Sequence, residues 1–366
     1  MKSILEKYKR RDSSVEILRI IACFIVVSVH IKLGITKADN SADFSRILVS
    51  CFVADGVGIF WMISGFYLNR QSDYLKQQIS TLKKIVFPAI AYVIIVILYM
   101  HLADKMNFSD IFFSLNFDIT NLQNYIRYTN HMWYIYIFIF ISLLLPLLKQ
   151  IIEYLDKHNG WKIFLPLTLF LLLWNDIKNN ALCEFSHHSI SALVPSIIVM
   201  IIGYFVYTRI ISNPKKFTLL LSFFIFATTN IVRAICEYNN YNESASIHVL
   251  FWYSLFGIIS SSSFATFVIL LFRKIKKSIF INYIASKTYL IYLIHVLFIM
   301  IFNKYQIDIY FQNLISSIDK GGIGDVLYVL IYGAVIFITS LLTTIVLDLI
   351  KTPFLIIKEK SIKSPN

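Results

Sequence analysis

Long apolar runs separated by short polar loops dominate this sequence. A helix needs about 20 apolar residues to cross a bilayer, and ten runs reach or approach that length. They cover residues 15–36, 46–69, 82–103, 132–152, 161–177, 189–209, 216–236, 247–272, 279–303 and 323–350. The run at 161–177 is the shortest. The pattern predicts an all-α, polytopic membrane helical bundle of about ten spans, built as a single domain over residues 1–366.

The composition agrees with a membrane protein. The chain is 57% hydrophobic and 15% charged, whereas soluble domains are about 25% charged. The net charge of +13 would suit nucleic-acid binding, but the basic residues are spread over the loops, as in membrane proteins. We therefore expect no nucleic-acid partner. The four cysteines form no CxxC pair, so we predict neither a disulfide framework nor a metal site.

Lys and Arg are distributed unequally between the two sides of the predicted bundle. With the N-terminus inside, both tails and the even-numbered loops hold 23 of the 34 basic residues, and the outer side holds 9, with Arg233 among them. Cytoplasmic segments carry the excess of Lys and Arg. This bias predicts that both termini are cytoplasmic.

The first apolar run, EILRIIACFIVVSVH, carries three ionisable residues. Arg19 and His30 are eleven positions apart, which in a helix places them on one face, ~16 Å apart along the axis. Glu16 lies one turn before Arg19 and can pair with it. Ionisable groups inside a span usually face a cavity or a pathway. The alternative is that Arg19 reaches the interface while His30 is a buried hydrogen-bonding residue between helices.

The second run, VADGVGIFWMISGFYLNR, contains Gly56, Gly58 and Gly65, which allow neighbouring backbones to approach closely. Ser64 is the hydroxyl in its apolar centre, and we favour a packing role over a nucleophile because no base is evident. Asp55 lies near the outer end, where it could orient a group or cap a helix.

Two later runs hold further candidates. His131 and Trp133 begin the fourth run at the outer interface, where Trp is common in membrane proteins. His295 lies in the middle of the ninth run, one turn after Tyr292. Each can contact a substrate, or be an ordinary interfacial or core side chain.

Taken together, these stretches resemble acyltransferase family 3, whose members are integral membrane proteins. The likeness rests on Glu16, Arg19, Ala22 and His30; on Phe60, Trp61, Ser64, Gly65 and Phe66; on His131, Trp133, Tyr134 and Pro146; and on Tyr292 to His295. These four pieces stand in the family's order and cover nearly the whole chain.

The resemblance implies transfer of an acyl group from cytoplasmic acyl-CoA, usually acetyl-CoA, to a hydroxyl of a bacterial cell-surface glycan or lipid-linked saccharide. The family's functional Arg and His map onto Arg19 and His30. Arg19 is placed to hold anionic or amide groups of the donor, with Glu16 fixing it, and His30 to act as general base. A multi-pass location in the bacterial cytoplasmic membrane follows, with membrane lipids around the bundle.

The chain departs from the family pattern at two places. Many members carry an Arg-x-x-Arg-like cluster before the third helix, where this chain has Lys83 and Lys84. Lysines still bind phosphate as point charges, and with Arg70 they are our candidates for the nucleotide end of the donor. Gly58 stands where many members have Asp or Pro.

Two other functions fit a ten-helix protein. A transporter or flippase also carries intramembrane charge, but it more often shows inverted repeats with broken helices at the midplane, which we do not find. A non-catalytic subunit would tolerate apolar residues at positions 19 and 30. The sequence leaves open the acceptor, the acylated position, the acyl chain length, an acyl-histidine route and a homo-oligomeric state.

Overall fold

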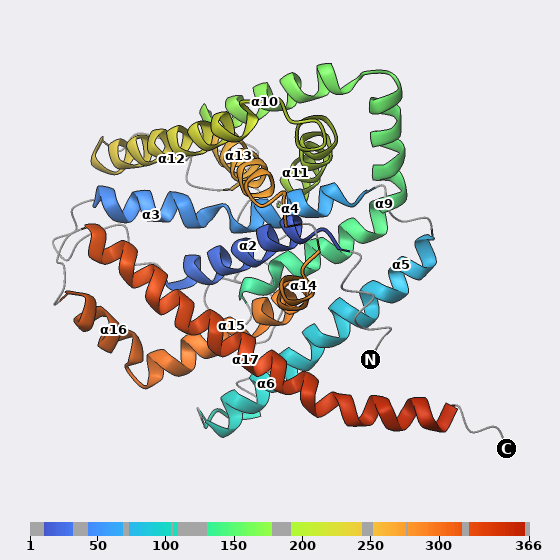
Figure 1. The fold of residues 1–366 in the computed structure, drawn as a ribbon. Coiled ribbons are helices and arrows are strands. Elements are labelled where there is room, and N and C mark those ends of the chain that lie inside the picture. Colours follow the sequence, from blue (N-terminus) through green and yellow to red (C-terminus); the bar gives the residue numbers. More distant parts are fainter. Residues whose placement is uncertain are drawn as a thin grey trace.

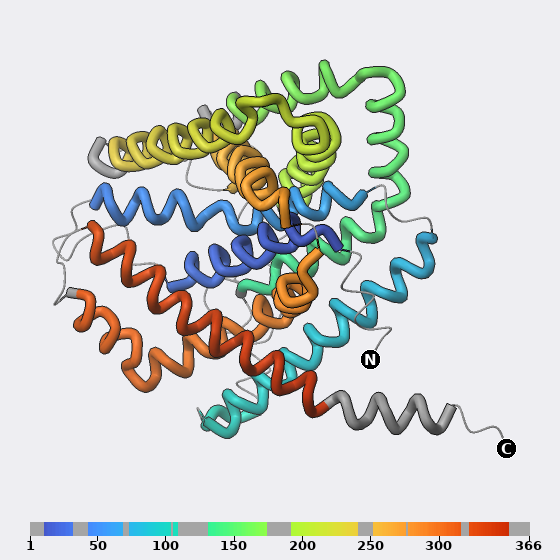
Figure 2. The backbone as a smooth tube through the Cα atoms, in the orientation of Figure 1, coloured from blue at the N-terminus to red at the C-terminus, as the bar shows by residue number. Residues whose placement is uncertain are grey.

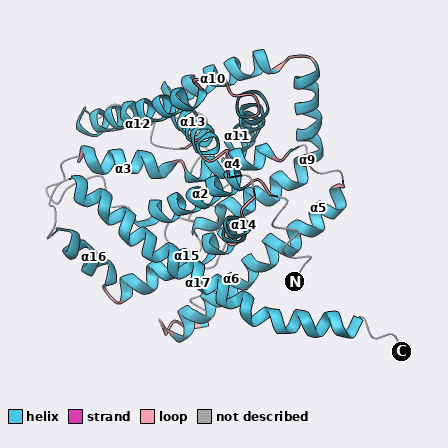
Figure 3. Ribbon diagram, in the orientation of Figure 1, coloured by secondary structure: helices cyan, strands magenta, loops and turns pink. Residues whose placement is uncertain are grey.

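The computed structural model describes residues 11–31, 43–68, 73–103, 105–108, 130–177, 192–243, 252–275, 277–316 and 322–362. Within these ranges the chain is helical and contains no strand (Figure 3). Its elements are α2 (Ser13–Ile31), α3 (Phe44–Ala54), α4 (Gly56–Phe66), α5 (Tyr74–Thr81), the π-helix η2 (Leu82–Val86), α6 (Phe87–Leu102), the 3₁₀ turn η3 (Asn130–Met132), α9 (Trp133–Lys157), α10 (Trp161–Ile177), α11 (Leu193–Phe205), the π-helix η6 (Val206–Ile211), α12 (Thr218–Glu243), α13 (Leu255–Leu271), α14 (Ile279–Ala285), α15 (Thr288–Lys304), α16 (Ile307–Ser316) and α17 (Gly322–Ile362).

The predicted helical membrane bundle is confirmed. Seven helices in the described ranges are long and apolar enough to cross a membrane, and the bent pair α14–α15 makes an eighth when counted as one span. The remaining two predicted spans correspond to shorter apolar helices, at Trp161–Leu173 and Leu255–Leu271. The count of ten spans and the cytoplasmic termini stay predictions.

Helix α2 lies at the centre of the bundle. In Figure 1 it runs with α3 and α4 through the middle of the molecule, between α10–α13 above and α14–α17 below. Figure 2 shows the same arrangement along the chain: α10 to α13, coloured green to light orange, lie on one side of α2, and α14 to α17, coloured orange to red, lie on the other. A residue on any face of α2 therefore meets another helix.

Two predicted helices are broken, which corrects the expectation that the spans contain no broken helix. The second span divides at Asp55 into α3 and α4, and the ninth divides into α14 and α15, which meet at a bend of 50°. The second break lies at Lys287, whose ammonium group forms an ion pair with Asp348 of α17. A lysine between apolar helices needs such a partner.

Small residues bring α4 and α11 into close contact. A Cβ on Gly203 would lie 2.7 Å from the Met62 backbone, and one on Gly65 would overlap the Met200 carbonyl oxygen. Gly56 and Gly58 approach side chains of other helices, where a Cβ would lie 2.7 Å from Val26 Cγ2 and 2.8 Å from Ser261 Oγ. The predicted close backbone approach is confirmed, and it holds Trp61 and Ile59 in the largest apolar core of the bundle.

Candidate active site around a histidine cluster

The N-terminal half of α2 holds a buried carboxylate and an arginine. Arg19 Nη1 donates to Glu16 Oε2 at 2.6 Å, and Arg11 Nη1 lies 3.5 Å from the same oxygen. The Glu16 side chain is 2% exposed and that of Arg19 is 20% exposed. The predicted pairing is confirmed. Because Glu16 is also held by Arg11, it anchors the Arg19 guanidinium and leaves its other N–H groups available.

An aromatic wall adjoins Arg19. The guanidinium carbon lies 6.0 Å from the centre of the Tyr67 ring. Tyr134, at the start of α9, lies within electrostatic reach of Arg19 and within hydrogen-bond reach of Ser64. Its ring is 4.5 Å from that of Trp61 and 5.7 Å from that of Tyr292, centroid to centroid. Tyr134 thus connects the surroundings of Arg19 with those of Tyr292 on α15.

The C-terminal end of α2 brings His30 into a cluster with two other histidines. The ring centroid of His30 lies 5.1 Å from that of His295 on α15 and 6.3 Å from that of His131 in η3. The rings of His131 and His295 are 5.2 Å apart. His131 and His295 are buried, whereas His30 is exposed. The sequence singled out all three residues but gave no sign that they meet.

Backbone carbonyl groups fix one nitrogen on each buried histidine. His131 Nε2 lies 3.1 Å from the Leu293 carbonyl oxygen, and His295 Nδ1 lies 2.7 Å from that of Tyr292. A carbonyl oxygen only accepts, so in each ring this nitrogen carries the proton. In a neutral ring the other nitrogen then carries no proton and offers a lone pair. His131 Nδ1 and His295 Nε2 are both buried without a hydrogen-bond partner in the structure.

Tyr292 links the two elements that carry His295 and His131. Its hydroxyl donates to the His131 backbone carbonyl, which ties α15 to η3. Its ring contacts that of His131 edge-on at 5.4 Å. Buried polar groups that satisfy one another in this way rigidify their surroundings. The sequence placed Tyr292 one turn from His295, and the hydrogen bond explains why that spacing matters.

The other predicted substrate-contacting residues are placed differently. Trp133 opens α9 and stacks on Trp252, with ring centroids 6.3 Å apart. Ser64 Oγ donates to the Phe60 carbonyl of its own helix at 2.9 Å. The choice between packing and a nucleophile for Ser64 stays a prediction. A substrate contact for either residue stays a prediction.

Asp55 occupies the N-cap position of α4, but its side chain pairs with a buried arginine. It is 1% exposed, and Arg233 Nη1 of α12 donates to its Oδ1 at 2.9 Å. As the residue before α4 it makes no capping hydrogen bond with its side chain. Arg233, which the charge pattern placed with the outer flanks and loops, lies within α12 and is fully buried. The sequence contained an indication of the Asp55–Arg233 pair, because ionisable residues inside two spans usually pair with each other.

The candidate nucleotide-binding residues fall at two places in the sequence, position 70 and positions 83 and 84. Lys83 and Lys84 are exposed on η2, directly before α6. Arg70 lies outside the described residues. Within the part of the chain that the structure describes, no group of three His, Cys, Asp or Glu side chains is arranged to hold a metal ion.

This fold and site define a polytopic helical membrane protein that gathers ionisable side chains inside the bundle. A comparison with protein families assigns its class, because the family model described as "Acyltransferase domain" matches residues 12–345. That range contains every candidate site residue and nearly the whole chain. The chain belongs to acyltransferase family 3 and is a membrane acyltransferase. No curated protein and no solved structure matches it.

Proposed function

We propose that this acyltransferase moves an acetyl group from cytoplasmic acetyl-CoA to a hydroxyl of a cell-surface glycan or lipid-linked saccharide. Transfer would take place at the extracytoplasmic face of the bacterial cytoplasmic membrane, within one domain spanning residues 1–366. One observation supports this most directly: an exposed His30 beside two buried imidazoles whose free nitrogens have no partner. A histidine that acts as general base needs an accessible ring nitrogen. A neighbouring group that accepts a hydrogen bond from its other ring nitrogen keeps the ring oriented.

His30 is the proposed base. Its bare ring nitrogen takes the proton of the acceptor hydroxyl while the hydroxyl oxygen attacks the thioester carbonyl carbon. The new C–O bond forms, the C–S bond breaks, and the imidazolium returns the proton to the departing sulfur of CoA. The products are an acetyl ester and free CoA. At the end of the reaction His30 is again neutral and can begin another cycle.

His131 and His295 are proposed to support His30. Both offer a lone pair, because their protonated nitrogens are turned to backbone carbonyls. A centroid distance of 5.1 Å lets facing nitrogens of His30 and His295 come within hydrogen-bond distance. The N–H of His30 would then point to His295, which leaves its other nitrogen free as the base. His131 and Trp133 lie beside this point and would contact the acceptor.

The Glu16–Arg19 pair is proposed to hold the donor. Arg19 shares a face of α2 with His30, so a pantetheine arm bound along that face leads from Arg19 towards the base. With the predicted orientation, Lys83, Lys84 and Arg70 would attract the nucleotide phosphates on the cytoplasmic side. An acetyl group carried first by His30 is the other route, and an acid quench of protein incubated with labelled acetyl-CoA would reveal it.

The decisive experiment measures consumption of acetyl-CoA by the purified protein, with and without a glycan extract. The parent is compared with His30→Gln and with His158→Gln, an exposed histidine at the end of α9. We expect turnover in the parent and in the control, and a loss of about 10²-fold or more in His30→Gln. A parent that neither binds nor consumes acetyl-CoA would refute the proposal.

A further inference from the structure

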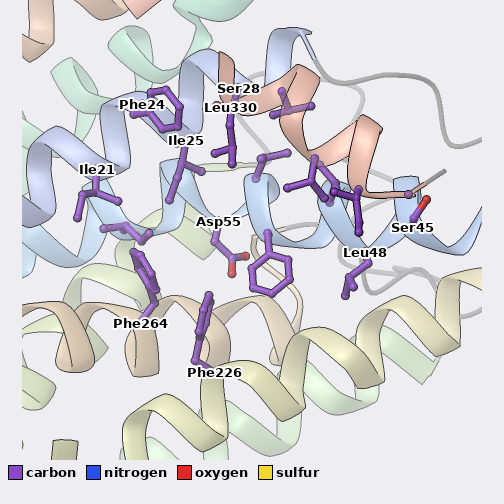
Figure 4. A pocket seen from close by; sticks show the side chains of 18 residues that line it. Ile21, Phe24, Ile25, Ser28, Ser45, Leu48, Asp55, Phe226, Phe264 and Leu330 are labelled. Atoms are coloured by element: carbon purple, nitrogen blue, oxygen red, sulfur yellow. The ribbon is translucent and has the colours of Figure 1, made fainter. Parts of the chain in front are cut away.

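An elongated cavity of about 700 Å³ lies between α2, α3, α12, α13 and α17. Its walls are apolar, with the rings of Phe24, Phe52, Phe226 and Phe264 among them. Figure 4 shows it running alongside α2, with Ile21 towards one end and Ser45 towards the other. We call it the lateral pocket. Its shape and lining suit a hydrocarbon chain better than a sugar or a nucleotide.

The lateral pocket is separate from the histidine cluster. Ile21, Ile25 and Ser28 line it, and they recur on one face of α2 at intervals of four and three residues. Arg19 and His30 each lie two residues from a member of that set, which turns them by about 200° around the helix. The proposed reaction site and the pocket therefore occupy opposite sides of α2.

Two buried polar atoms in the pocket lack partners. Asp55 Oδ1 accepts the hydrogen bond of Arg233, and the Ser260 hydroxyl lies close to the carboxylate, but Asp55 Oδ2 makes no hydrogen bond in the structure. Ser28 Oγ, on α2, is likewise unpartnered, and both residues are 1% exposed. Figure 4 shows the Asp55 carboxylate among the pocket side chains. A buried carboxylate oxygen without a donor is unfavourable, so a hydrogen-bond donor inside the pocket would stabilise Asp55 Oδ2.

The pocket is accessible from the lipid-facing surface. Its exposed lining side chains are apolar and lie on α3 and α17, among them Phe52, Ile323, Val326 and Leu330. In a membrane these side chains face hydrocarbon. An occupant therefore enters from the bilayer. At the end of the pocket near Ser45, Arg46 and Asp325 form an ion pair at 3.1 Å, which provides a polar environment for a headgroup.

We propose that the lateral pocket binds a membrane lipid whose hydrocarbon chain carries a hydroxyl or amide N–H, which donates to Asp55 Oδ2. A plain hydrocarbon chain fills the walls but leaves that oxygen unpaired. A cation does not fit, because Arg233 already neutralises the carboxylate.

A matched pair of probes tests the proposal: methyl 3-hydroxytetradecanoate and methyl tetradecanoate. Delipidated protein is titrated with each, and thermal unfolding gives the apparent affinity, because a ligand that binds the folded state raises its stability. We expect the hydroxy ester to bind about tenfold more tightly or better, as one hydrogen bond to a charged group predicts. Equal affinities would overturn the role of Asp55.

Two variants locate the binding. Val49→Trp fills the pocket, whereas Leu342→Trp adds the same side chain to the lipid-facing surface of α17. The preference for the hydroxy ester should be lost in the first and kept in the second. If Val49→Trp does not fold, a photoreactive hydroxy ester on the parent should label α3 and α17 near the pocket. Labelling confined to α6 and α10 would contradict the proposal. Neither assay contains an acyl donor, so its outcome is independent of the acyltransferase proposal.

Discussion

The imidazole rings of His30 and His295 lie 5.1 Å apart, and the His295 nitrogen that does not face a backbone carbonyl has no partner. One ring comes from the first span and the other from the ninth. In the proposed mechanism this arrangement would make His295 a positioning residue for His30 rather than an isolated core histidine. It also gives the site a lone pair that can stabilise a protonated His30.

Replacing His295 by Asn should lower kcat with little change in the KM for acetyl-CoA. Asn keeps a polar group but cannot place the same lone pair next to His30, and a hydrogen bond to a charged group is worth ~1.5–3 kcal/mol. We therefore expect a loss of about tenfold to a hundredfold in kcat. The His158→Gln control should retain parental kinetics. A second readout is the ¹⁵N spectrum of His30, whose tautomer should change in the variant; an unchanged spectrum and kcat would show that His295 only packs.

Replacing Glu16 by Gln should weaken donor binding. Glu16 holds Arg19 at 2.6 Å while it is nearly fully buried, so the neutral amide loses a charge-assisted hydrogen bond and leaves Arg19 less restrained. We expect KM for acetyl-CoA to rise by about tenfold, with a smaller effect on kcat. Arg19→Lys should show the same change, because a lysine does not reproduce the planar fork of donors. A loss confined to kcat in both variants would place the pair in the chemical step.

Replacing Asp55 by Ala should destabilise the fold strongly. Arg233 is fully buried and would remain charged in the bundle with its Oδ1 partner removed. Removing one member of such a pair typically costs ~3–5 kcal/mol. The measurement is thermal unfolding in detergent. The double variant Asp55→Leu with Arg233→Met should regain much of the loss, and a double variant as unstable as Asp55→Ala would show that the pair is needed for more than mutual neutralisation.

The sequence predicted the membrane bundle, the shared face of Arg19 and His30, and the Glu16 pairing, because each follows from apolar run length or helical periodicity. The meeting of His30, His131 and His295 depends on how α2, η3 and α15 pack, which no local pattern encodes. The breaks at Asp55 and Lys287 were missed for a related reason. Each lies beside a charge whose partner, Arg233 or Asp348, is distant in sequence.

The contact between α4 and α11 predicts the effect of a single methyl group. Gly65→Ala would place a Cβ on the Met200 carbonyl oxygen, and backbone cannot yield as a side chain can. We expect a loss of ~1–3 kcal/mol in stability, the usual cost of overpacking. Gly160→Ala is the matched control, because there the new Cβ meets the flexible end of Leu155 at 2.9 Å. Thermal unfolding of the two variants decides the point, since equal stabilities would mean that α4 and α11 can separate without cost. Because α4 also carries Trp61 beside Tyr134, a separation of the helices should lower acetyl-CoA turnover as well.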